Sequence, residues 1–192
     1  MMFFCGSHTA GKTSILKSLQ EYGIIDYLGA EIGKELFYAR SLNPAKQDDN
    51  FEFEVTQLEL KRDALIMKNK YKMPAVESWH IGNLAYALER NPRSVERLIQ
   101  LINTSPWLHN AYGIWLRVSK ENIFKRTKTF SMERQWAAEF YALIDSKIES
   151  CFDMLGLTNY CIVDANQDLD KVIKDVHNII QSKLKGNLCQ YI

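Results

Sequence analysis

The residues best suited to chemistry lie near the amino terminus, in "GSHTAGKT" at positions 6–13. This segment fits the pattern GxxxxGK[ST], whose glycines let a loop curl until its backbone N–H groups point at phosphate oxygens. Lys12 would reach the β- and γ-phosphates of ATP, and Thr13 would offer a hydroxyl to Mg²⁺. The alternative is a chance match in a glycine-containing loop. The predicted nucleotide-binding residues are Gly6, Ser7, His8, Thr9, Ala10, Gly11, Lys12, Thr13 and Ser14, with His8 at a variable position of the loop.

Two carboxylates follow apolar runs elsewhere in the chain. Glu77 ends "PAVE" at 74–77, and Glu31 follows "IIDYLGA" at 24–30. A phosphate-binding loop needs an acid near its Mg²⁺, and phosphoryl transfer to a hydroxyl benefits from a second acid that accepts the proton. We therefore expect Glu77 to serve the metal together with Thr13, and Glu31 to act as the base. The alternative for Glu31 is an acid that stabilises a helix amino terminus.

Arg62 lies in an otherwise apolar helical stripe. At 100° per residue, it falls among five apolar positions: Phe51, Val55, Leu58, Leu65 and Ile66. A guanidinium on an inward face should meet an anion, because burying it unpaired is costly. The partner could be a substrate phosphate, a base carbonyl or a structural carboxylate. Gln57 falls off the stripe and is a weaker candidate for contact with substrate.

Basic residues cluster in "SKENIFKRTKTFSMERQW" at 119–136. Cations that close over the γ-phosphate when substrates bind assist phosphoryl transfer, so we expect a lid at about 125–136 with Arg126 as a catalytic residue. The alternative is a solvated helix face. The segment "VDANQD" at 163–168 would form a wall of the nucleotide-base pocket, with Asn166 as its candidate contact.

These residues need a scaffold, and the hydrophobic pattern predicts one. Apolar strand-like runs at 1–5, 24–30, 74–77, 112–118 and 160–165 alternate with helical patterns. One such pattern opens at Ser131 and runs to Gly156, and "NPAKQDDN" at 43–50 reads as a loop. Alternation of this kind predicts an α/β fold with a parallel sheet covered by helices, whose ligands bind at the carboxyl ends of the strands. With 192 residues, the chain is expected to form a single domain, 1–192.

Composition limits the function classes. With 24 basic and 23 acidic residues, the net charge of +1 argues against a dedicated nucleic-acid binder. No apolar run is long enough to span a bilayer, and "MMFFCG" lacks the basic region of a signal peptide. The four cysteines form no CxxC pair and are interpreted as reduced core thiols. We therefore expect a cytoplasmic protein that does not bind membranes, and a homodimer is left open.

Several motifs resemble the thymidylate kinase-like branch of P-loop nucleoside and nucleotide kinases. Members carry Asp-Arg-Tyr and then Ser-Leu-Ala-Tyr, and here "ESW" at 77–79 is followed by "NLAY" at 83–86. "LRVSKENIFKRTK" at 116–128 is similar to the strand and lid entry of that family, with Arg126 at the lid arginine. Glu31 also resembles the base of deoxynucleoside kinases. The resemblance implies a three-layer P-loop sandwich with a five-stranded parallel sheet in the order 2-3-1-4-5, and a kinase that uses ATP and Mg²⁺.

One departure bears on the acceptor. Ser78 replaces the arginine that in this family contacts a phosphate, while Trp79 and His80 could either touch substrate or pack in the core. The expected activity is transfer of the γ-phosphate to a small nucleotide or nucleoside, with a slight preference for a monophosphate because of Arg62. The alternatives are a kinase of another nucleoside-like hydroxyl compound, such as nicotinamide riboside or a modified base, and a regulatory P-loop ATPase without a small acceptor.

Overall fold

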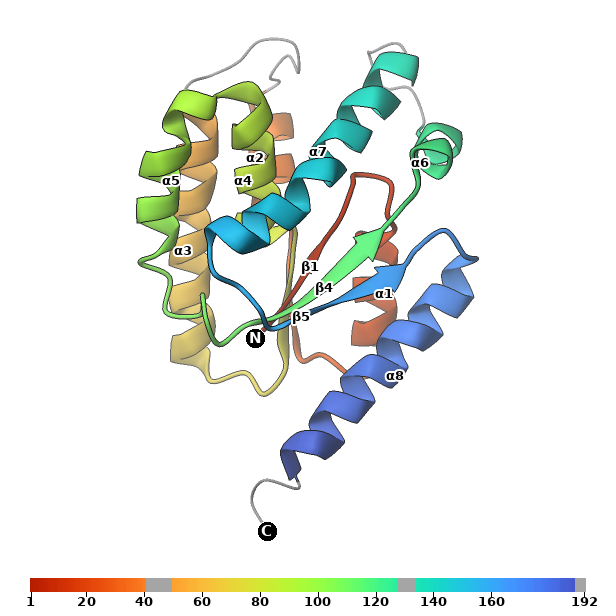
Figure 1. The fold of residues 1–192 in the computed structure, drawn as a ribbon. Helices are drawn as coiled ribbons and strands as arrows, with labels where there is room; N and C mark the ends of the chain where they lie inside the picture. Colours follow the sequence, from red (N-terminus) through yellow and green to blue (C-terminus); the bar gives the residue numbers. More distant parts are fainter. Residues whose placement is uncertain (41–49, 128–133, 189–192) are drawn as a thin grey trace.

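A computed structural model describes residues 1–40, 50–127 and 134–188 of the chain. Its centre is a five-stranded, fully parallel sheet in the order β2-β3-β1-β4-β5, as the sequence predicts (Figure 1). The strands are β1 (Met2–Cys5), β2 (Tyr27–Gly29), β3 (Pro74–Glu77), β4 (Tyr112–Arg117) and β5 (Tyr160–Asp164).

Helices connect the strands and cover both faces of the sheet, which gives three layers (Figure 1). The helices are α1 (Lys12–Glu21), α2 (Ile32–Ala39), α3 (Phe51–Asn69), α4 (Trp79–Arg90), the short 3₁₀ helix η1 (Pro92–Ser94), α5 (Val95–Ile102), α6 (Lys120–Arg126), α7 (Arg134–Met154) and α8 (Leu169–Leu188). In the described ranges, no helix combines the length and the apolar character that a membrane span requires.

Two hydrophobic cores form on the two faces because strand side chains alternate. Phe3 and Cys5 of β1 point into a core shared with α3, α4, α5 and α7. Met2 and Phe4 point the other way, into a core shared with α1 and α8. All four residues of β1 are buried, as expected for the central strand of a covered parallel sheet. Because β1, β2 and β3 run parallel, their carboxyl ends lie at the same edge of the sheet.

The face of α3 that packs against the protein differs from the predicted stripe. Leu65 is 58% exposed, whereas Glu52, Thr56, Glu59 and Asp63 are buried. Four of the six positions on the predicted stripe are buried as expected, namely Phe51, Val55, Arg62 and Ile66, so the buried face keeps part of that stripe and extends onto the polar side chains. The prediction was wrong for Leu65 and missed the polar positions, because apolar periodicity cannot find hydrogen-bonding groups on the inward face of a helix. The predicted loop at 43–50 and the predicted helix start at Ser131 fall largely or wholly outside the described residues.

Candidate active site

The loop between β1 and α1 has the backbone that a phosphate cradle needs. Gly6 and Gly11 have φ angles of 132° and 91°, which L side chains rarely adopt. A Cβ atom on Gly6 would also lie 2.4 Å from the Leu116 carbonyl oxygen. Lys12 is only 4% exposed, and its Nζ donates to the carbonyl oxygens of Gly6 (3.1 Å) and Ser7 (3.0 Å). The loop is therefore folded around the ammonium group of Lys12.

Two hydroxyl groups of this loop fit a bound phosphate. The Oγ of Ser7 and the Oγ1 of Thr9 are buried and have no hydrogen-bond partner among the described residues. Buried polar atoms are normally paired, so such atoms call for a polar ligand. The loop borders a cavity of about 270 Å³ that also touches Arg126 and Tyr141. The Asp145 carboxylate on α7 anchors the loop, because it accepts a hydrogen bond from the Ser7 N–H at 2.9 Å.

Glu77 lies beside the hydroxyl that the sequence assigns to Mg²⁺. The Thr13 Oγ1 donates to Glu77 Oε1 at 2.7 Å, which brings the end of β3 against the start of α1. Oxygen donors of this kind are the ligands that Mg²⁺ prefers, so the pair fits the metal. Burial raises the pKa of the Glu77 carboxyl, and the charge of Glu31 adds to this, while Lys12 opposes it. A cation at this position would offset the cost of keeping Glu77 ionised.

Glu31 lies at the amino terminus of α2, where its Oε1 accepts a hydrogen bond from the Ser78 Oγ at 3.0 Å. Ser78 belongs to an unusual turn after β3, because Ser78 (φ 63°) and Trp79 (φ 43°) both have positive φ angles. Consecutive non-glycine residues in this region are strained and are found mainly at functional sites. The turn is held by the Ser78 N–H, which donates to the Phe4 carbonyl oxygen at 2.8 Å.

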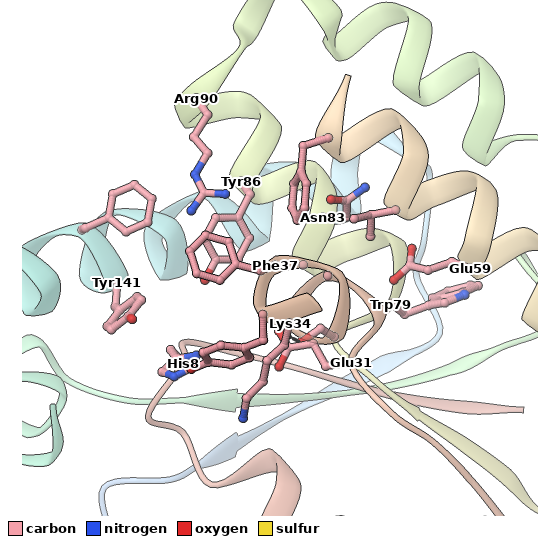
Figure 2. A pocket seen from close by; sticks show the side chains of 17 residues that line it. His8, Glu31, Lys34, Phe37, Glu59, Trp79, Asn83, Tyr86, Arg90 and Tyr141 are labelled. Carbon is pink, nitrogen blue, oxygen red and sulfur yellow. Dashed lines mark hydrogen bonds between the residues drawn. The ribbon is translucent and has the colours of Figure 1, made fainter. Parts of the chain in front are cut away.

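A second cavity, of about 180 Å³, opens next to Glu31 (Figure 2). Helices α2, α3, α4 and α7 supply most of its lining, and aromatic rings dominate it. The rings belong to Phe37, Tyr38, Phe51, Trp79, Tyr86, Phe140 and Tyr141. The acids of this lining are Glu31 and Glu59, and its lysine and arginine are Lys34 and Arg90. The pocket thus suits a flat, uncharged ring system with a few polar groups.

The two cavities meet at His8 and Tyr141, which line both. Their rings stack with centroids 4.8 Å apart, so the variable position of the loop forms part of the boundary. Burial lowers the pKa of the His8 imidazole, and the nearby ammonium group of Lys12 lowers it further. His8 is therefore a neutral ring at neutral pH. A ligand in the aromatic pocket would adjoin a nucleotide in the loop at this boundary.

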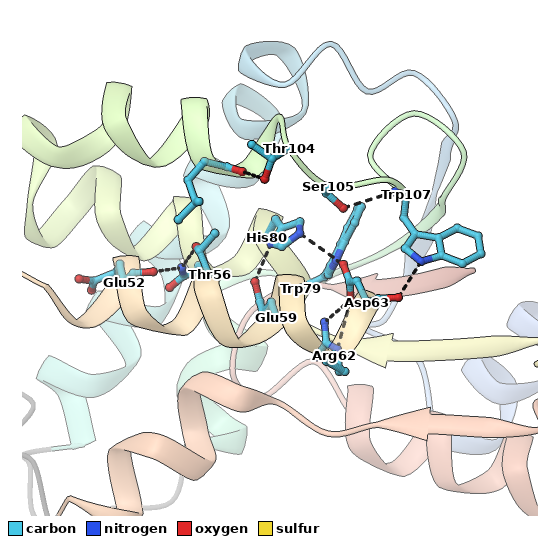
Figure 3. Close-up of polar contacts among 12 residues, drawn as sticks. Glu52, Thr56, Glu59, Arg62, Asp63, Trp79, His80, Thr104, Ser105 and Trp107 are labelled. Atoms are coloured by element: carbon cyan, nitrogen blue, oxygen red, sulfur yellow. Dashed lines mark hydrogen bonds and ion pairs between the residues drawn. The ribbon is translucent and has the colours of Figure 1, made fainter. Parts of the chain in front are cut away.

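Of the four residues predicted to contact substrate, only Trp79 is among the residues that line the aromatic pocket. Arg62 is 8% exposed, and its guanidinium donates to the Ala30 carbonyl oxygen (3.2 Å) and to Asp63 Oδ1 (3.3 Å). His80 is fully buried between Glu59 and Asp63, as Figure 3 shows, and neither Arg62 nor His80 lines the aromatic pocket. Trp79 is also buried and donates to Asp63 Oδ2 at 2.8 Å, but its ring does line the pocket. Gln57 is exposed and lines neither described cavity.

Arg126 and Asn166 stabilise the loop that follows β5. The Arg126 guanidinium donates to the carbonyl oxygens of Ala165 (2.8 Å) and Gln167 (3.3 Å) and lines the cavity at the phosphate loop. The Asn166 side chain accepts from the Ser119 N–H at 2.8 Å and is not part of that cavity's lining. Of the predicted lid, residues 128–133 lie outside the described residues.

The aromatic pocket was not found by sequence reasoning, apart from Glu31 and Trp79. Asn83, Tyr86 and Arg90 of α4 are spaced three and four residues apart and share one face of the helix. The Arg90 guanidinium lies 4.6 Å from the Tyr86 ring centroid and 5.3 Å from that of Phe140. This spacing is visible in the sequence, but without the fold nothing shows that this helix face borders a pocket.

No model of a known protein family matches the sequence, and no curated protein is significantly similar to it. Solved structures do share the fold. A deoxyadenosine kinase from M. mycoides with the products dCMP and dCDP is 17% identical, with a TM-score of 0.62, over 94% of this chain and 98% of that one. The YorR protein from Bacillus subtilis, in complex with phosphorylated GDP, is 15% identical with a TM-score of 0.60, over 96% and 97% of the two chains.

The NadR protein in complex with NR has a TM-score of 0.71 at 15% identity, and the match covers 92% of this chain but only half of the NadR chain. These similarities show that the chain has the fold of P-loop kinases. At this level of identity, they show the fold alone.

Proposed function

We propose that the protein is a kinase that uses ATP and Mg²⁺ to phosphorylate a hydroxyl group of a small nucleoside-like acceptor. The observation that carries this proposal is the junction of the two cavities. The phosphate loop borders one cavity, the aromatic pocket forms the other, and both share His8 and Tyr141. Glu31 lines the aromatic pocket, whereas Glu77 accepts a hydrogen bond from Thr13 of the phosphate loop. This separation supports different roles for the two acids.

The chain's own residues suit each part of the reaction. The loop N–H groups and Lys12 would bind the phosphates, with the hydroxyls of Ser7 and Thr9 as further donors. Thr13 and Glu77 would hold Mg²⁺, which offsets negative charge on the phosphates when bound. Glu31 would accept the proton of the acceptor hydroxyl. In the same step the hydroxyl oxygen would bond to the γ-phosphorus, and the bond between the γ-phosphorus and the bridging oxygen of ADP would break. Ser78 would orient the Glu31 carboxylate for that transfer.

The pocket favours an uncharged nucleoside over a monophosphate. A monophosphate brings up to two negative charges. Of the lysine and the arginine in the lining, Arg90 forms an ion pair with Glu52 at 3.6 Å, and Lys34 shares the lining with the Glu31 carboxylate. The preference for a monophosphate inferred from the sequence depended on Arg62, whose guanidinium is occupied by Asp63 and the Ala30 carbonyl. The solved structures of similar fold, a deoxyadenosine kinase and the NadR protein with NR, agree with this class of acceptor.

A screen for ADP release tests the proposal. Purified protein with ATP and Mg²⁺ is given ribo- and deoxynucleosides, nicotinamide riboside and the matching monophosphates. We expect at least one nucleoside to stimulate ADP release and its monophosphate to be much less effective. Lys12→Ala, with an unchanged circular dichroism spectrum, should abolish the stimulation. ATP turnover that no acceptor stimulates would instead support a regulatory ATPase.

A further inference from the structure

A buried wall of the aromatic pocket carries polar groups that the proposed chemistry does not use. Glu59 of α3 and Asn83 of α4 both line the pocket (Figure 2). Glu59 is 2% exposed and Asn83 is 7% exposed, so a ligand beside them would meet them in a largely dry environment. Polar groups in such a place decide which ligands bind, because an unmatched buried donor or acceptor is costly.

The orientation of the Asn83 amide is fixed by its partners. Its Nδ2 donates to the Glu52 carbonyl oxygen at 2.6 Å and to the Thr56 Oγ1 at 2.7 Å. A backbone carbonyl can only accept, so this end of the amide must be the NH₂ group. Both of its hydrogens are then used within the protein. The group that Asn83 can offer to a ligand is therefore its carbonyl oxygen, an acceptor.

Glu59 is likewise held as an acceptor. Its Oε2 lies 2.8 Å from the His80 Nδ1, and the His80 Nε2 lies 3.4 Å from Asp63 Oδ2 on the other side (Figure 3). Burial disfavours a charged imidazole, but hydrogen bonds and charge from Asp63 and Glu59 outweigh this and raise the pKa of His80. The His80 Nδ1–H donates to the Glu59 carboxylate, and the Nε2 faces the Asp63 carboxylate. Glu59 therefore presents a carboxylate to the pocket, which can accept but not donate.

We propose that Glu59 and Asn83 select the acceptor by its base and require an edge rich in N–H donors, such as an amino group beside a ring N–H. This inference rests on the proposed function, and it names the class of nucleoside that the pocket takes. A base that turns carbonyl oxygens toward this wall would face the acceptor oxygens of Glu59 and Asn83 without a proton between them. Bases that turn an amino group toward this wall should therefore bind, and bases that lack it or carry an oxo group in its place should be rejected.

The test compares guanosine with inosine, which lacks the 2-amino group, and cytidine with uridine, which carries an oxo group in place of the 4-amino group. For the wild-type protein we expect kcat/KM for the amino-bearing member of at least one pair to be roughly 10- to 150-fold higher, the range of a hydrogen bond to a charged group. Glu59→Gln, in which His80 holds the amide oxygen and the NH₂ group faces the pocket, should remove or invert that ratio. Glu54→Gln makes the same chemical change on α3, at a surface ion pair with Arg40, and should preserve the ratio.

Because Glu59 also contacts His80, Glu59→Gln could fail to fold. Thr56→Val is the second variant: it leaves Glu59 in place but removes one acceptor that fixes the Asn83 amide. It should reduce the ratio by roughly 2- to 13-fold, the range of a neutral hydrogen bond. A wild-type preference for inosine and uridine, or ratios that neither variant changes, would overturn the inference.

Calorimetric binding of the same pairs without ATP separates this inference from the proposed function. Selective binding of the amino-bearing nucleosides without any phosphorylation would remove the kinase assignment but retain the role of Glu59 and Asn83. Phosphorylation of both members of each pair at equal efficiency would retain the kinase and remove the selectivity.

Discussion

Glu31 and Glu77 follow two adjacent strands, yet they make different contacts. Glu77 is bonded to Thr13 of the phosphate loop, whereas Glu31 accepts from Ser78 and borders the aromatic pocket. If Glu31 is the base, Glu31→Gln should lower kcat by roughly 10²- to 10⁴-fold with little change in the Mg²⁺ requirement. Glu77→Gln should instead raise the Mg²⁺ concentration for half-maximal activity by roughly 10- to 100-fold.

Magnesium titrations of both variants at saturating ATP check this division of roles. The wild-type titration is the reference, and circular dichroism controls for folding. Equal shifts of the Mg²⁺ requirement in the two variants would contradict it.

Substitution of Arg62 distinguishes a structural role of this residue from a role in acceptor binding. Arg62→Met leaves the buried Asp63 carboxylate without its guanidinium, so we expect a loss of about 3–5 kcal/mol in the free energy of unfolding. KM for a nucleoside acceptor should stay unchanged, because Arg62 does not line the pocket. Urea unfolding and acceptor titrations measure the two effects. Arg93→Met on the exposed η1 turn is the matched control and should change stability by no more than about 0.5 kcal/mol.

The opposite result for Arg62 would have a clear meaning. A rise in acceptor KM of roughly 10- to 150-fold with unchanged stability would favour a monophosphate acceptor that Arg62 binds directly.

At the scale of elements, the interface of α3 with α4 is polar where most helix interfaces are apolar. Glu59, His80, Asp63 and Arg62 form one buried cluster, in which two cations balance two anions when His80 is protonated. The cluster extends to Trp107, whose Nε1 donates to the Asp63 carbonyl oxygen at 3.2 Å. A cluster of this kind fixes the register of the two helices that carry Glu59 and Asn83.

The cluster predicts a dependence of stability on pH. The pKa of His80 is raised in the folded protein above its ordinary value of 6.5, so the folded state binds the proton more tightly than the unfolded state. The resulting stabilisation is fully present below about pH 6.5 and is lost as the pH rises through the folded-state pKa. The slope should approach about 1.4 kcal/mol per pH unit within that window. Urea unfolding of the wild type and of His80→Gln across this range measures it, and identical slopes would contradict the prediction.

The same interface shows why the sequence predicts some elements better than others. The runs 74–77 and 160–165 are short and mainly apolar, and strands form there at Pro74–Glu77 and Tyr160–Asp164. The run 24–30 yields only β2 at Tyr27–Gly29, the edge strand next to β3. In α3, the inward position of Arg62 was predicted, but Leu65 is outside and Glu59 is inside. Polar groups that satisfy one another across two helices leave no periodic signal in either helix alone.

At the scale of the whole molecule, the sheet order was expected from the resemblance to P-loop kinases, and the helical layers were expected from the alternation of apolar runs with helical patterns. The phosphate-loop pattern is visible in the sequence because eight consecutive residues, 6–13, carry it. The aromatic pocket was not visible there, because it combines side chains from α2, α3, α4 and α7 that are far apart in the sequence. Only the packed molecule shows that His8 and Tyr141 join this pocket to the phosphate loop.

The most direct test of the central claim is to detect the phosphorylated product. Protein, Mg²⁺ and ATP labelled at the γ-phosphate are incubated with the nucleoside that best stimulates ADP release, and the products are identified by mass spectrometry. We expect a labelled nucleoside monophosphate in the same amount as ADP, and almost none with folded Lys12→Ala or Glu31→Gln. Label that appears only as inorganic phosphate, in an amount that the nucleoside does not change, would contradict the account.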